Sequence, residues 1–146
     1  MENKTFQNWK NQWEKPEQMG SWSYISFNIH PDNLLIVGEL FFPKMVEVED
    51  YVFFEEKFDE ASFQNWKTSM PGDTNLEKII NHIHIYDLFE NCSDEIEEAT
   101  FIEIANLLKT TWDNFFKIKF PTRKIVVELT NYETDYGPTI MVYQFD

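Results

Sequence analysis

Aromatic side chains constrain this chain more than any other feature of the sequence. It contains 14 Phe, 6 Tyr and 5 Trp among 146 residues, which is 17% of the chain. Side chains of this size need a packed interior, and a domain of this length buries about 70% of its unfolded surface. The formal net charge is −14, so the charges must lie on the surface of a folded domain. We predict one acidic, globular domain, residues 1–146, rather than a disordered chain.

Several classes of protein are disfavoured by what the sequence lacks. The first residues have no apolar segment or cleavage pattern, so we expect no signal peptide. The longest apolar stretch, 34–42, is shorter than the ~20 residues of a membrane span. Cys92 is the only cysteine, which fits a reducing, cytoplasmic location. No glycine loop for phosphate is present, and an acidic surface repels nucleic acid and membranes, so we expect no cofactor, nucleic acid or membrane partner.

Hydrophobic periodicity predicts an α+β fold with the order α-β-β-β-α-α-α-β-β. The expected sheet is antiparallel with about five strands, a three-strand meander plus a C-terminal hairpin, and helices pack on it. The expected elements are a helix (5–19), strands (22–30, 34–42 and 46–54), helices beginning near 60, 74 and 94, and strands (124–130 and 139–145) joined by the loop 131–138. Asp59 is the expected N-cap of the helix that begins near 60.

The motif His82-Ile83-His84, followed by Asp87, is the only candidate for metal chemistry. On a strand the two imidazoles would face the same side and could share a metal ion. On a helix, residues two apart diverge by roughly 200°. A capping box at 74–77 and the Leu/Ile spacing after it favour the helix. We therefore predict no metal site, with His82, His84 and Asp87 as weak candidates, and leave open whether 76–90 is helix or strand.

Acidic residues concentrate in two patches. Around Asp94, acids at the start of the last long helix complement its dipole, which explains them locally. Glu47 and Glu49 have no such reason, because like charges adjacent on the outer face of a strand cost stability. We therefore expect a cationic partner at the first patch, which consists of Glu47, Glu49, Asp50, Glu55, Glu56, Asp59 and Glu60. The second patch consists of Glu90, Asp94, Glu95, Glu97 and Glu98.

Two aromatic residues join the predicted partner-binding set. Trp22 and Tyr24 share the less apolar face of the expected strand 22–30, which hints at a surface aromatic pair. Packing in the core is the favoured alternative for these two side chains. No pair of carboxylates and no nucleophile stands out as catalytic. The sequence therefore favours a binding protein over an enzyme.

In size, charge, lack of a signal segment and absence of catalytic motifs, the chain resembles the small acidic immunity proteins that bacteria make beside secreted toxins. The resemblance implies an inhibitor that covers the Lys and Arg residues with which a basic, nuclease-like toxin holds phosphate. Two alternatives stay open: a small enzyme, metal-dependent through His82 and His84, and an adaptor or regulatory domain without a tight basic partner. The sequence predicts neither the partner's identity nor the oligomeric state.

Overall fold

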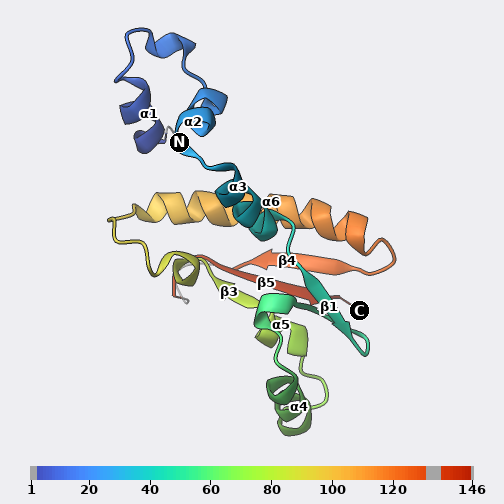
Figure 1. Ribbon diagram of the computed structural model, residues 1–146. Helices are drawn as coiled ribbons and strands as arrows, with labels where there is room; N and C mark the ends of the chain where they lie inside the picture. The colour runs from blue at the N-terminus through green and yellow to red at the C-terminus, as the bar shows by residue number, and fades with distance from the viewer. Residues whose placement is uncertain (1–2, 131–135, 146) are drawn as a thin grey trace. The chain divides into compact units, whose positions relative to one another are not determined.

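The computed structural model describes residues 3–130 and 136–145. The chain divides into two compact units, Met1–Leu40 and Phe41–Asp146. The described residues contain both helices and two antiparallel sheets, of two and three strands (Figure 1). The predicted α+β class with about five antiparallel strands is therefore confirmed, although the strands form two sheets. That the whole chain acts as one domain stays a prediction.

The N-terminal unit is helical. Its elements are α1 (Lys4–Lys10), the 3-10 helix η1 (Pro16–Gln18), α2 (Ser21–Asn28) and α3 (Pro31–Phe41). Asn3 begins α1, because its side-chain oxygen accepts a hydrogen bond from the backbone N–H of Phe6 at 2.9 Å. The rings of Phe6 and Trp9 pack against Tyr24, with centroids 5.9 and 5.2 Å away. An aromatic cluster between α1 and α2 thus holds this unit.

The predicted strands 22–30 and 34–42 are helices, so the predicted meander is wrong. In α2, Tyr24 and Phe27 are three residues apart, and both contact the aromatic face of α1. That contact favours helical spacing over the alternation in the sequence. In α3, Pro31 occupies the first helical position, where its fixed φ suits a helix. A continuous apolar run such as 34–42 does not by itself distinguish a strand from a helix.

The predicted single strand 46–54 is a hairpin of β1 (Met45–Val48) and β2 (Tyr51–Phe54), in which Val48 pairs with Tyr51. The two-residue turn between them contains Glu49, whose φ is 54°. Tight hairpin turns need positive φ, which Gly or Asn usually provides. Glu49 carries no such signal, and the turn was therefore not predicted.

The second sheet has the order β3-β5-β4 and is antiparallel throughout. Its strands are β3 (His82–His84), β4 (Ile125–Leu129) and β5 (Thr139–Gln144). The predicted C-terminal hairpin of 124–130 and 139–145 is confirmed, and most of its loop lies outside the described residues. One sheet face, with Val127 and Ile140 buried, packs against α6 (Glu98–Lys119), whose Trp112 and Phe116 are also buried. In Figure 1, α6 runs across this sheet.

The remaining elements lie between the hairpin and α6 in the chain. They are η2 (Glu55–Lys57), α4 (Glu60–Ser69), α5 (Leu76–Ile80) and η3 (Tyr86–Phe89). Asp59 caps α4 as predicted, by accepting from the N–H of Ser62 at 2.8 Å. The capping box at 74–77 is wrong: Asn75 caps α5, and the carboxylate of Glu77 is buried elsewhere. Because α5 ends at Ile80, the predicted helix does not reach the histidines.

Two buried polar side chains join the hairpin to the second sheet. Glu77, 2% exposed, accepts hydrogen bonds from the backbone N–H of Val52 (2.7 Å) and of Gln144 (2.5 Å). Asn81, fully buried, accepts from the N–H of Phe54 (3.0 Å) and donates to the carbonyls of Val52 (2.8 Å) and Val142 (3.0 Å). Burial of these groups is tolerated because they are paired.

We expect Asn81→Ala to lower the free energy of unfolding by about 3 kcal/mol, because it leaves buried backbone groups of both sheets without their hydrogen-bond partner. Urea denaturation monitored by circular dichroism measures this loss. The matched control is Asn106→Ala on the exposed side of α6, which should change stability by less than about 0.5 kcal/mol. Equal effects of the two variants would contradict the bridging role of Asn81.

Candidate functional site

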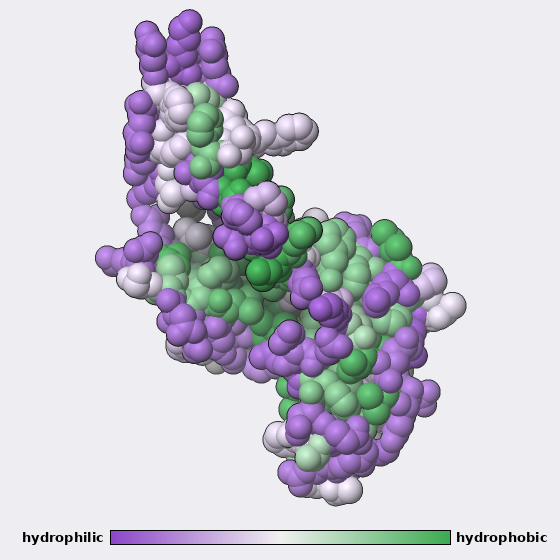
Figure 2. Space-filling model, in the orientation of Figure 1, coloured by the Kyte–Doolittle hydropathy of each residue, from purple (hydrophilic) through white to green (hydrophobic). Residues whose placement is uncertain are grey.

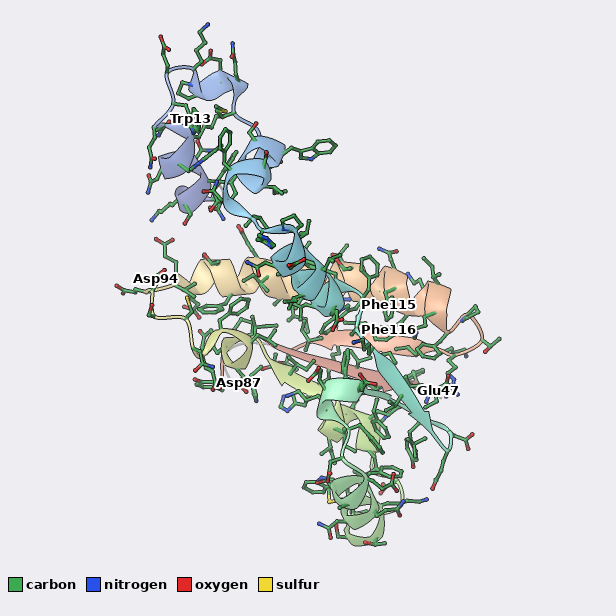
Figure 3. All side chains as sticks on the ribbon, in the orientation of Figure 1. Trp13, Glu47, Asp87, Asp94, Phe115 and Phe116 are labelled. Atoms are coloured by element: carbon green, nitrogen blue, oxygen red, sulfur yellow. The ribbon has the colours of Figure 1, made fainter. Side chains whose placement is uncertain are left out.

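The first of the two predicted acidic patches is called the hairpin acidic patch from here on. Its residues lie on β1, in the hairpin turn, on η2 and at the start of α4. Its first two acids have intramolecular partners. Oε2 of Glu47, which is labelled in Figure 3, lies 2.6 Å from Nη2 of Arg123. Oε1 of Glu49 lies 2.5 Å from Nζ of Lys67. Glu49 also belongs to the turn and not to the strand face. The argument that these two acids lack a structural reason is therefore wrong.

Two further acids of the patch serve α4. The side chain of Asp59 accepts the capping hydrogen bond from Ser62, and hydrogen bonding to Ser62 lowers the pKa of this carboxyl. Oε1 of Glu60 accepts from the side-chain amide of Gln64 at 2.9 Å. These acids are exposed, but part of their hydrogen-bonding capacity is already used within the helix.

Asp50 is exposed in the hairpin turn, and the contacts from Arg123 and Gln144 go to its carbonyl and not to its carboxylate. Glu55 and Glu56 also differ from the paired and capping acids of the patch. Both are exposed and adjacent on η2, and among the described residues neither carboxylate has an ion pair or hydrogen bond. Their backbone is fixed: the N–H of Glu55 donates to the carbonyl of Lys44 at 2.9 Å. Figure 2 shows mostly hydrophilic side chains around α4, at the lower end of the view. The patch therefore includes two adjacent carboxylates that no cation pairs with in the described part of the chain.

The second acidic patch lies mostly in a loop. Glu90, Asp94 and Glu95 are exposed between η3 and the start of α6 (Figure 3). The helix begins at Glu98 and not at Asp94, and Glu97 stands at its N-cap position. Only the last two acids of this patch are thus placed to complement the helix dipole.

Trp22 and Tyr24 do not form the predicted surface pair. They lie on α2, where residues two apart diverge, and only Trp22 is strongly exposed, at 87%. Tyr24 packs in the aromatic cluster, with its ring 5.2 Å from that of Trp9. A role of Trp22 in partner binding stays a prediction.

His82 and His84 lie on β3, so the predicted helix is wrong at this point and the alternative strand is correct. The two rings share one face of the strand, with centroids 4.5 Å apart. Asp87 lies separately, exposed on η3 (Figure 3). Within residues 3–130 and 136–145, no group of three or more His, Cys, Asp or Glu side chains is arranged to hold a metal ion.

One polar cluster on the second sheet was not predicted. The hydroxyl of Tyr143 donates to Oε2 of Glu128 at 2.7 Å, and Nζ of Lys78 lies 3.4 Å from the same oxygen. The Tyr143 hydrogen bond, with the charge of Lys78, lowers the pKa of Glu128. Desolvation lowers the pKa of Lys78, but Tyr143 and Glu128 outweigh it, and the net shift is upward. The alternation of side chains in the predicted strands 124–130 and 139–145 puts Glu128 and Tyr143 on the face away from the buried residues. This alternation is the sequence signal from which the pair could have been found.

Comparisons of the chain with protein families, characterised proteins and solved structures find no match. None of the helices in the described part of the chain combines the length and apolarity needed to cross a bilayer.

We expect Tyr143→Phe to destabilise the protein at pH 7 by less than about 1 kcal/mol, since Glu128 is partly exposed. A lowered carboxyl pKa stabilises the fold above the unfolded value of about 4.3, and this stabilisation is lost as pH falls through the folded pKa. The difference from wild type should therefore shrink between pH 7 and pH 3 in urea titrations. In a Glu128→Gln background the effect of Tyr143→Phe should not vary with pH; an unchanged pH dependence there would contradict the assignment.

Proposed function

We propose that this protein binds a basic protein through the hairpin acidic patch and neutralises it by covering its cationic residues, as an immunity-type inhibitor. The observation that carries the proposal is the pair Glu55 and Glu56. Two adjacent, exposed carboxylates without a partner repel each other. A cationic partner relieves that repulsion. Binding such a partner therefore explains the adjacent carboxylates, whereas the isolated fold does not.

The local structure favours binding because the pair is held in place. The residue before Glu55, Phe54, is 4% exposed, and its carbonyl accepts from the N–H of Phe58 at 3.0 Å. The ring of Phe58 stacks on Phe53, with centroids 5.3 Å apart. A fixed backbone lowers the ordering cost of association, so more of the electrostatic attraction appears as affinity.

The other acids of the patch support binding through their field. Glu47 and Glu49 keep their partners Arg123 and Lys67, and they hold the hairpin against other elements. Together with Asp50 and Glu60 they add negative charge to the hairpin acidic patch. Such a field accelerates encounter with a cationic surface, and the acceleration falls as salt is added.

Occlusion is the proposed mechanism. A nuclease-like toxin holds phosphate with Lys and Arg side chains, and carboxylates that occupy those side chains prevent nucleic acid from binding. No catalytic step is needed on the inhibitor. We also propose a bacterial, cytoplasmic setting, where the exposed thiol of Cys92 would stay reduced.

We expect nanomolar or tighter binding to one basic toxin domain encoded beside this gene. Stopped-flow association rates should fall at least about tenfold between 25 and 500 mM NaCl. Glu55→Lys/Glu56→Lys should slow association at low salt by about tenfold or more and weaken inhibition of the toxin. An association rate independent of salt would contradict the proposal.

The matched control is Asp94→Lys/Glu95→Lys, which changes the net charge equally on the second patch. It should have a much smaller effect on the association rate. Equal slowing by both double variants would mean that net charge alone acts and that the hairpin patch is not the binding site.

A further inference from the structure

We propose that His82 and His84 form a two-histidine site for a transition-metal dication of the Zn²⁺ class. The site is independent of the acidic patch. It consists of the two imidazoles on one face of β3, with water or an external ligand in the remaining positions. Imidazole nitrogen is a preferred ligand of Zn²⁺ and its neighbours in the first transition row, whereas Mg²⁺ and Ca²⁺ prefer oxygen.

The separation of the rings fits chelation of one ion. Zn–N bonds are about 2.1 Å long, so two imidazoles on one tetrahedral ion have ring centres about 5 Å apart. The observed centroids are 4.5 Å apart with an angle of 56° between the ring planes. The observed separation is thus close to that of two imidazoles on one ion, and both rings lie on the same face of β3.

The hydrogen bonds of Thr139 select the tautomer of His84 that a metal needs. Oγ1 of Thr139 lies 2.9 Å from Nδ1 of His84 and donates to the carbonyl of Gly137 at 3.2 Å. A hydroxyl has one proton, and the carbonyl can only accept. The hydroxyl must therefore accept from Nδ1–H, which leaves the lone pair on Nε2. Metal-binding histidines are commonly held in this way, by donating their second N–H to a neighbouring group.

The site is also rigid. Thr139 is fully buried, and β5 pairs His84 with Thr139 and His82 with Met141. Gly137, with φ of 68°, lies against the ring of Tyr86, where a Cβ atom would come within 2.6 Å. Its carbonyl is thereby held in place beside the Thr139 hydroxyl. Ligands held by packing and hydrogen bonds lose little freedom when the ion binds.

The first test is isothermal titration of the full chain with Zn²⁺, with folding checked by circular dichroism. His82→Ala and His84→Ala should each lower the affinity of one site at least tenfold, and millimolar Mg²⁺ should not compete. His30→Ala, the matched control, should leave this site unchanged. Zn²⁺ binding that survives both His82→Ala and His84→Ala, or that Mg²⁺ displaces, would place the ion on the acidic surface and overturn the proposal.

The second test reads the tautomer without metal. Long-range ¹H–¹⁵N spectra of the imidazoles should show neutral His84 protonated at Nδ1. Thr139→Val should weaken Zn²⁺ binding about tenfold and change the tautomer signals, whereas Thr139→Ser should restore both. A His84 protonated at Nε2 in the wild-type protein would overturn the assignment, whatever the stability of the variants.

Discussion

Both candidate sites depend on the hydrogen bonds of one buried side chain, the amide of Asn81. Its amide joins the backbone of β2 to that of β5, and it directly precedes His82 in the chain. The side-chain oxygen of Asn81 accepts a hydrogen bond from the backbone N–H of Phe54, the residue before Glu55. One buried amide therefore fixes where η2 leaves the hairpin and where β3 joins the sheet. The acidic pair and the histidine pair therefore each follow directly on a residue that these hydrogen bonds hold, Phe54 and Asn81.

Glu77 gives the same junction its charge. A buried carboxylate is costly unless its oxygens are used, and here two backbone N–H groups and the side-chain amide of Gln144 use them. Because each bond has a single geometry, the two sheets can meet in only one register. Arg123 extends this junction outward: it binds the carbonyl of Asp50 and the carboxylate of Glu47. The hairpin is thus held by polar contacts on its inner and outer sides.

Local signals in the sequence predicted the parts of the fold that local chemistry decides. Asp59 as a cap and the alternation of the C-terminal hairpin are such signals, and both were correct. The strand predicted at 22–30 was wrong because the aromatic partners of Tyr24 and Phe27 lie on another segment. The strand predicted at 34–42 was wrong because a continuous apolar run fits a helix as well as a strand. Glu77 was predicted to take part in a helix cap. Its burial depends on strands 25 and 67 residues away, which leave no local signal in the sequence. The acids of the first patch were found, but their partner Arg123 is 76 residues from Glu47, beyond any local pattern.

The acidic residues behind the net charge of −14 therefore have different roles in the structure. Glu47 and Glu49 are paired with cations, Asp59 caps a helix and Glu77 accepts from backbone N–H groups, and each of these contacts stabilises the fold. Glu55 and Glu56 have none of these, although Lys67 and Arg123 show that the fold can place cations beside this hairpin. The unpaired Glu55 and Glu56 add repulsion to an already acidic chain, a cost that Glu47 and Glu49 reduce through their ion pairs. A binding surface explains that difference between neighbours, whereas a need for solubility would be met equally well by acids at any exposed position.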